Sequence, residues 1–266
     1  MTFSIVARAG DSFGVAVASK FLAVGAVVPA AEAEVGAVAT QSYANLAYRP
    51  QGLTFLRTGA GADATIAGLT GADAERATRQ VGVVGRDGDG ATFTGDGCHS
   101  WAGGVAGDGY AIQGNILTGP EVVAAMEAAW RFSTGTLARR LVGALTAGDE
   151  AGGDRRGRQS AALLVVRRGG GYGGGSDVEV DLRVDDDPAP VTTLARLLQL
   201  HELYFTRPDP ESLLELSGEL QAEVQRRLTA LGFADLDAWA GVENLEERLV
   251  AGKIDPLVLD HLRAAS

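Results

Sequence analysis

The sequence has one cysteine, three histidines and only two lysines, Lys20 and Lys253, among its 266 residues. The single Cys98 excludes an internal disulfide and is typical of a protein from a reducing compartment. The histidines stand far apart and lack the spacing of metal ligands, so we expect neither a metal nor another cofactor.

Long hydrophobic runs are also absent, since no apolar stretch reaches the roughly 20 residues of a membrane span. The N-terminus lacks the basic segment and continuous apolar stretch of a signal peptide. A net charge of −11 argues against nucleic acid and acidic membranes as partners. We therefore expect a cytoplasmic protein, and its 46% hydrophobic residues are enough for a sizeable core.

Thr2 follows the initiator Met1, and a small residue at this position generally permits removal of the methionine. The mature chain would then begin with a hydroxyl beside its own α-amine, which is a nucleophile and a base within one residue. Apolar stretches at 3–7 and 13–18, separated by turn residues at 9–12, predict a hairpin that starts at Thr2. The alternative is that Thr2 is an ordinary second residue before an edge strand.

The remaining pattern predicts antiparallel hairpins with helices between them, a layered α+β sandwich. We expect strands at 3–9, 13–19, 35–41, 160–166 and 178–184, with short strands between 80 and 115. We expect helices at 50–59 and 62–70, from about Pro120, at 137–147, and from Pro190 to near Phe205.

A linker from Thr206 to Pro210 divides the expected domains into residues 1–206 and 207–266. Asp209 as N-cap and Pro210 as the first helical residue predict a helix start inside it. The tail is expected to be a small all-helical domain. Its apolar stripe, which we interpret as a packing face, consists of Leu213, Leu214, Leu216, Leu220, Val224 and Leu228.

Residues 151–162 place glycines, three arginines and an aspartate between a helix and a buried strand. Because arginine forks match planar anions, this loop is predicted to bind a carboxylate or phosphate. The substrate-binding candidates are Asp154, Arg156, Gln159 and Ser160. An arginine-rich turn in solvent is the alternative.

Amide side chains near strand ends are the other candidates. Gln41 and Asn45 lie at the end of one strand and Asn115 closes another, where amides could stabilise a developing oxyanion. Turn formation or satisfied core polarity would equally explain them. Lys20, at the end of the second strand, could lower the pKa of the threonine by proximity, or could be an exposed strand-end residue.

Seven motifs occur in order: TFSIVAR at 2–8, VGAVVP at 24–29, GAVATQ at 36–41, RQVGVV at 79–84, QGNIL at 113–117, AGGDRRGRQSAALLV at 151–165 and DLRVDD at 181–186. Over roughly residues 1–205 they resemble the bacterial family known as domain of unknown function 1028. The tail, with LDAW at 236–239, ENLEER at 243–248 and IDP at 254–256, resembles a small helical module classed with peptidoglycan-binding domains.

The first resemblance implies a fold similar to the N-terminal nucleophile hydrolases, a four-layer αββα sandwich with two antiparallel sheets between helical layers. It implies Thr2 as the nucleophile of an amide (C–N) hydrolase, or of an acyl transferase with the same mechanism. Asn115 or Gln41 would stabilise the oxyanion, while Asp154 with Arg156 would orient an acidic small-molecule amide. A homodimer is expected.

Two contrasting hypotheses remain for the same fold. One is a non-catalytic scaffold with a role in assembly or peptidoglycan binding. The other is a ligand-binding protein that has the pocket without the chemistry.

Overall fold

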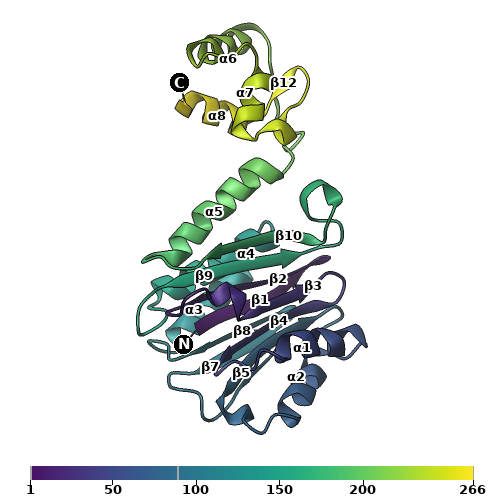
Figure 1. The fold of residues 1–266 in the computed structure, drawn as a ribbon, viewed down its shortest axis with the longest axis vertical. Coiled ribbons are helices and arrows are strands. Elements are labelled where there is room, and N and C mark those ends of the chain that lie inside the picture. Colours follow the sequence, from purple (N-terminus) through teal and green to yellow (C-terminus); the bar gives the residue numbers. More distant parts are fainter. Residues whose placement is uncertain (1, 89, 266) are drawn as a thin grey trace. The chain divides into compact units, whose positions relative to one another are not determined.

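Two antiparallel sheets lie face to face in the computed structural model, which describes residues 2–88 and 90–265 (Figure 1). The six-stranded sheet has the order β10-β9-β2-β1-β8-β7, with β1 Thr2–Ala9, β2 Ser12–Ser19, β7 Gly103–Gly107, β8 Tyr110–Asn115, β9 Ser160–Val166 and β10 Val178–Val184. The four-stranded sheet has the order β3-β4-β5-β6, with β3 Pro29–Glu32, β4 Gly36–Ser42, β5 Arg79–Gly85 and β6 Gly90–Thr94. The expected antiparallel α+β fold is therefore confirmed.

Three apolar clusters set the order of the layers. One lies between the sheets and includes Val6, Val15, Val17, Ala39, Val84 and Ala111. A second joins the six-stranded sheet to α3 Glu121–Phe132, α4 Leu137–Glu150 and the first turns of α5 Pro190–Phe205. A third joins the four-stranded sheet to α1 Tyr48–Arg57 and α2 Ala62–Gly71. Helices thus cover the outer face of each sheet.

The alternation of side chains along β1 decides which of them reach the space between the sheets. Phe3 and Ile5 belong to the cluster under α3 and α4, whereas Val6 belongs to the cluster between the sheets. Thr2 and Ser4 share the face of Val6, so polar side chains occupy the N-terminal end of this inter-sheet space.

A tight turn fixes the pairing of β1 with β2. Gly10 adopts a left-handed φ of 57°, which glycine tolerates without strain, and the hairpin pairs Ala9 with Ser12 and Phe3 with Ala18. β1 also pairs with β8, so it is a central strand. The alternative of an edge strand at Thr2 is therefore wrong.

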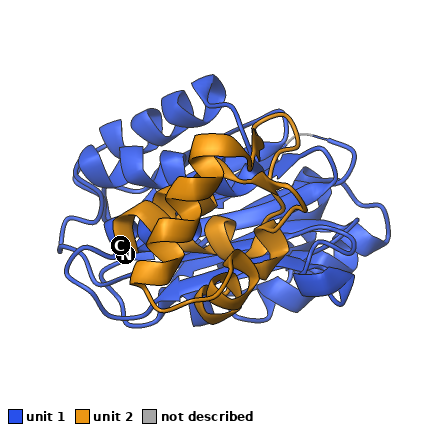
Figure 2. Ribbon diagram, turned by 90° about the horizontal axis from the view of Figure 1, so that it is seen from above, with its two compact units in different colours: residues 1–198 blue, residues 199–266 orange. Residues whose placement is uncertain are grey.

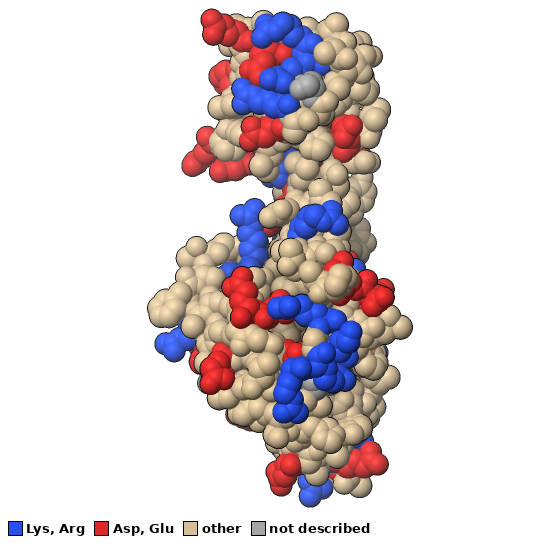
Figure 3. All heavy atoms as spheres, turned by 90° about the vertical axis from the view of Figure 1, so that its left-hand side faces the viewer, with Lys and Arg blue, Asp and Glu red and all other residues tan. Residues whose placement is uncertain are grey.

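Shorter elements complete the larger unit, which spans residues 1–198 (Figure 2). Three 3₁₀ helices lie at η1 Val24–Ala26, η2 Arg76–Thr78 and η3 Tyr172–Gly174. Strand β3 was not expected from the sequence; it pairs with β4. On the face of this unit visible in Figure 3, basic and acidic side chains lie next to one another. Ion pairs in this unit include Arg158 with Asp149 at 2.7 Å and Arg168 with Glu34 at 2.8 Å.

The second unit, residues 199–266, has its own apolar core around the buried Trp239. Its helices are α6 Gly218–Ala230, α7 Leu236–Glu243, η4 Glu246–Arg248 and α8 Pro256–Ala265. It also contains a two-stranded sheet of β11 Leu214–Glu215 and β12 Lys253–Ile254, so the expectation of an all-helical domain is corrected. The units divide within α5, rather than after it at residue 206.

The helix expected from Pro210 also begins later, at Gly218. Asp209 accepts the backbone N–H of Glu211 at 3.0 Å and caps only a short turn. The pairing of Leu214 with Ile254 then draws the chain into β11, so strand pairing overrides the local helix signal. Among the described residues, no helix is long and apolar enough to cross a membrane.

A buried arginine connects two segments of the second unit. The Arg248 guanidinium pairs with Asp255, and both side chains are less than 5% exposed. Its Nε donates to the carbonyl of Leu203 at 2.5 Å, and another nitrogen donates to Thr206 Oγ1 at 2.6 Å. Removal of one partner from a buried ion pair leaves the other charge desolvated and unpaired.

We expect Arg248→Met to destabilise this unit by about 3–5 kcal/mol, because Asp255 would stay buried without its partner. Arg263→Met is the matched control; Arg263 pairs with Glu223 but is 44% exposed, so water screens this pair and its loss should have a much smaller effect. Hydrogen-exchange mass spectrometry of residues 199–265 measures both. Equal effects of the two substitutions would contradict this role for Arg248.

Candidate active site

Thr2 lies at the start of central strand β1, and its side chain faces the four-stranded sheet. The Thr2 hydroxyl is 3.1 Å from the Ser19 hydroxyl at the end of β2, and the Thr2 residue is 5% exposed. Gln41 of β4 donates its amide to the Thr2 carbonyl at 3.2 Å. Asn115 of β8 is the direct strand partner of Thr2. Residues on four strands from both sheets, including β1 itself, therefore fix the position of Thr2.

Below Thr2, buried amides form a network that connects the two sheets. Ser4 donates its hydroxyl to Gln41 Oε1 at 2.7 Å and accepts from Gln113 Nε2 at 2.6 Å. Gln41 Nε2 and Asn115 Nδ2 both donate to Gln80 Oε1, at 2.8 and 2.9 Å. All five side chains are at most 1% exposed. Buried polar groups that are bonded in this way rigidify the surrounding structure.

A glycine makes room for one of these amides. A Cβ on Gly82 would stand 2.1 Å from Gln113 Oε1, so no larger residue fits while Gln113 keeps this position. Among the described residues, this oxygen and the hydroxyl of Thr65 are the only buried side-chain acceptors or donors that lack a hydrogen-bond partner. Gly82 is thus part of the architecture of the network.

A pocket of about 280 Å³ opens beside Thr2. Residues at 21–28, between β2 and β3, form one wall, and residues at 42–46, from the last residue of β4 onward, form the other. The lining consists of Thr2, Phe21, Val24, Val27, Val28, Gln41, Ser42, Ala44 and Leu46. The nucleophile candidate therefore borders a space in which a small molecule can be held.

Backbone strain gathers at this end of the sheets. Ala23, Ser42 and Ile116 have left-handed φ values of 52°, 71° and 48°, although none is glycine. Ala23 and Ser42 belong to the two pocket walls, and Ile116 directly follows Asn115. Such strained residues cost of order 1–3 kcal/mol each and cluster at functional sites.

A cluster of charged and polar side chains outside the pocket holds the wall formed by residues 42–46 in place. Asp73 accepts hydrogen bonds from Arg79 at 2.9 Å, from Tyr48 at 2.9 Å and from Asn45 at 3.1 Å. Arg79 also donates to the carbonyl of Tyr43 at 2.5 Å. Asn45, expected to bind substrate, therefore holds the backbone of the wall to Asp73.

These contacts shift two pKa values. The Arg79 guanidinium, followed by Asn45, the Glu75 backbone and Tyr48, holds the pKa of Asp73 well below its usual range, although burial opposes the shift. Burial and the hydrogen bond to Asp73 raise the pKa of Tyr48 far above its ordinary value. The cluster is therefore an ionised aspartate surrounded by donors at neutral pH.

The polar side chains of the loop around Asp154 bind other groups of the protein. Asp154 is buried and accepts the backbone N–H of Lys20 at 2.7 Å and of Arg156 at 2.8 Å. The Arg156 side chain turns back onto Asp154 at 3.2 Å. The Lys20 ammonium donates to the Arg158 carbonyl at 3.2 Å, on the exposed surface. None of these four residues lines the pocket beside Thr2.

Gln159 and Ser160 also bind protein groups. Gln159 donates to Asp186 at 3.1 Å, and its backbone N–H donates to the Ser19 carbonyl at 3.1 Å. The Ser160 hydroxyl donates to the Phe21 carbonyl at 2.5 Å and accepts from Val24 N at 3.1 Å. The bonds of Ser160 attach the pocket wall formed by residues 21–28 to β9, so Ser160 supports the shape of the pocket without lining it.

Of the residues singled out from the sequence, the structure thus brings Thr2, Gln41 and Asn115 together. It adds four residues that were not proposed as site residues: Ser19, Ser4, Gln80 and Gln113. The register of the first hairpin indicates Ser19. Phe3 pairs with Ala18, so the next pair along the two strands would be Thr2 with Ser19. Ser4, Gln80 and Gln113 join the site through contacts between the sheets, and no local sequence pattern indicates them.

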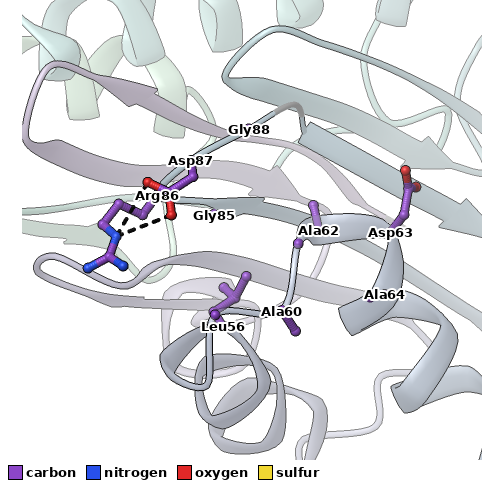
Figure 4. A pocket seen from close by; sticks show the side chains of 11 residues that line it. Leu56, Ala60, Ala62, Asp63, Ala64, Gly85, Arg86, Asp87 and Gly88 are labelled. Carbon is purple, nitrogen blue, oxygen red and sulfur yellow. Dashed lines mark hydrogen bonds and ion pairs between the residues drawn. The ribbon is translucent and has the colours of Figure 1, made fainter.

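A second hollow, of about 380 Å³, lies between the end of α1, the start of α2 and the loop after β5 (Figure 4). Glycine and alanine make up most of its lining, and Arg86 pairs there with its neighbour Asp87 at 3.5 Å. It offers no nucleophile–base pair. In the described part of the chain, no group of three or more His, Cys, Asp or Glu could hold a metal ion.

The fold and site define an α+β protein with a buried strand-end hydroxyl beside a small pocket. Residues 2–194 match the model of a family of unknown function, DUF1028, and the chain belongs to this family. Residues 204–262 match the model described as "Putative peptidoglycan binding domain". No curated protein matches the sequence.

Solved structures similar to this chain include the following two. Protein SPO2555 from Silicibacter pomeroyi, described with the same family model, is 29% identical, with a TM-score of 0.68 over 83% of this chain and 88% of that protein. Eukaryotic HslV from Trypanosoma brucei is 10% identical, with a TM-score of 0.40 over 61% of this chain and 98% of its own. The HslV likeness is too distant to support any inference about the site.

Asp73 should make stability depend on acid pH. Because its folded pKa is depressed, its stabilisation is present above the unfolded pKa of about 3.9 and is lost as the pH falls below it. We expect Asp73→Asn to lower the melting temperature at pH 7 by several degrees, and the difference from wild type to shrink between about pH 4 and 2. Circular dichroism melts measure this, with the exposed Asp63→Asn as control. A constant difference down to pH 2 would contradict the assignment.

Proposed function

We propose that this protein is an amide hydrolase, or an acyl transferase with the same mechanism, in which Thr2 is the N-terminal nucleophile after removal of Met1. The observation that carries the proposal is the Thr2 hydroxyl, held 3.1 Å from Ser19 at the start of a central strand and bordering a pocket. The sandwich of two antiparallel sheets between helices, which resembles the N-terminal nucleophile hydrolases, supports it.

The chemistry follows from a hydroxyl beside its own amine. The α-amine, with a pKa of about 7.7–8.0, is partly neutral at pH 7 and accepts the hydroxyl proton as Oγ1 attacks the carbonyl carbon. The tetrahedral intermediate collapses, the C–N bond breaks, and the amine returns the proton to the leaving nitrogen. Water then attacks the ester on Thr2 with the same amine as base, which releases the acid and restores the hydroxyl.

Neighbouring groups would position this pair. Ser19 fixes the orientation of the Thr2 hydroxyl, and Gln41 fixes the Thr2 carbonyl. The two amide hydrogens of Gln41 already serve three acceptors, whereas the Asn115 amide donates to one acceptor among the described residues, Gln80 Oε1, so we favour Asn115 as the oxyanion donor. A small-molecule substrate, a homodimer and a cytoplasmic location stay predictions.

We expect Thr2→Ala to lower turnover of a chromogenic acyl p-nitroanilide by about 10³-fold or more, because the attacking oxygen is gone. Thr2→Ser is the matched control, since it keeps both a small second residue and a hydroxyl. Its activity should stay well above that of the alanine variant, and both variants should melt close to wild type. Intact mass establishes whether Met1 is absent. Near wild-type turnover by Thr2→Ala, or full activity with Met1 retained, would reject the proposal.

The model match over residues 204–262 favours a second function, peptidoglycan binding by the C-terminal unit. This unit has its own core, so it can carry a separate activity. Under this proposal the full chain should sediment with purified peptidoglycan sacculi, while a chain ending at Thr206 should stay in solution. Equal recovery of both chains in the supernatant would reject this function and leave the hydrolase proposal untouched.

A further inference from the structure

None of the described residues that line the pocket beside Thr2 has a charged side chain. Six of its nine lining residues are apolar, namely Phe21, Val24, Val27, Val28, Ala44 and Leu46. The three polar ones are Thr2, Gln41 and Ser42, and the amide of Gln41 is bonded to the Thr2 carbonyl and the network. Beyond the nucleophile, the pocket therefore offers mainly hydrophobic surface.

Cations on the neighbouring segments are bonded to other groups. Lys20 donates to the Arg158 carbonyl, and Arg49 donates to the Ala26 carbonyl at 2.8 Å. Arg79 pairs with Asp73 and Glu75 outside the pocket. The one cation that the proposed mechanism brings to the lining is the Thr2 α-amine, which must be neutral to act as the base. A carboxylate at the far end of the acyl group would therefore lose its hydration in this space without a cation beside it, which is strongly unfavourable.

The mouth of the pocket adds exposed apolar surface. Phe21 is 50% exposed and Leu46 is 48% exposed, and they stand on opposite walls. Leu22 and Tyr43, next to them in sequence, are 59% and 57% exposed. Large side chains gathered in this way at a pocket mark a ligand-binding surface.

The volume of the pocket also limits the size of the ligand that it can hold. Pockets for drug-sized ligands measure roughly 300–1,000 Å³, and this one, at about 280 Å³, falls just below that range. We propose that the pocket selects a small, uncharged, apolar acyl group, whose carbonyl it presents to Thr2. This inference rests on the proposed hydrolase function and replaces the acidic amide suggested by the sequence with a neutral one.

The test compares two acyl groups of equal length, hexanoyl and adipoyl p-nitroanilide, which differ in a terminal carboxylate. We expect wild type to prefer hexanoyl by at least about tenfold in kcat/KM, because the pocket cannot solvate the charge. Leu46→Arg places a cation at the mouth and should reduce or reverse the preference. Phe132→Arg, at an 84% exposed position on α3, adds the same charge elsewhere and should leave the preference unchanged.

A binding measurement separates this inference from the hydrolase proposal. Ligand-observed NMR on Thr2→Ala, with hexanamide and with adipic acid monoamide, reports pocket selectivity without turnover. If neither anilide is cleaved but hexanamide binds preferentially, and Leu46→Arg removes that preference, the pocket assignment holds and the hydrolase function fails. Preference for the adipoyl compounds, binding of neither amide, or an unaltered preference in Leu46→Arg would overturn the assignment.

Discussion

The structure depends on a set of buried amide hydrogen bonds that cross between its two sheets. Ser4 on one sheet donates to Gln41 on the other, Gln41 donates back to the Gln113 carbonyl, and Asn115 donates across to Gln80. Apolar packing between sheets is non-directional, whereas these bonds have specific partners, and an unmade one costs about 1–3 kcal/mol. They therefore set how the sheets are placed against each other where Thr2 begins the chain's first strand.

The same network explains why the site is at this end of the sandwich. Along β1, the side chains facing the other sheet change from hydroxyls at Thr2 and Ser4 to Val6, which lies in the apolar inter-sheet cluster. The apolar part contributes most of the stability, and the polar end holds reactive groups in position. The left-handed residues Ala23, in a loop, and Ser42, the last residue of β4, occur where the chain leaves this polar end, and the surrounding bonds can hold a strained backbone there.

The pocket walls are loops, yet both are secured from behind. Ser160 binds the Phe21 carbonyl and the Val24 amide, while Asp73 and Arg79 hold residues 43–48. Such supports matter because a nucleophile and a substrate must meet within a fraction of an ångström. Several polar residues that a sequence reader would assign to substrate binding therefore serve the shape of the pocket. The substrate would meet mainly the apolar side chains between them.

The sequence by itself determined the elements governed by local rules. Alternating apolar residues and the turn at Gly10 set the first hairpin, and its register brings Ser19 to Thr2. Only the tertiary structure decided which amides meet, because Gln41 and Gln80 reach Ser4 and Asn115 through the packing of one sheet on another. It also decided that Asp154 and Arg156 bind each other and the backbone of Lys20, since a charged loop looks alike in sequence whether it faces a ligand or its own chain. Pairing of β11 with β12 likewise involves residues about 40 positions apart, which no local periodicity encodes.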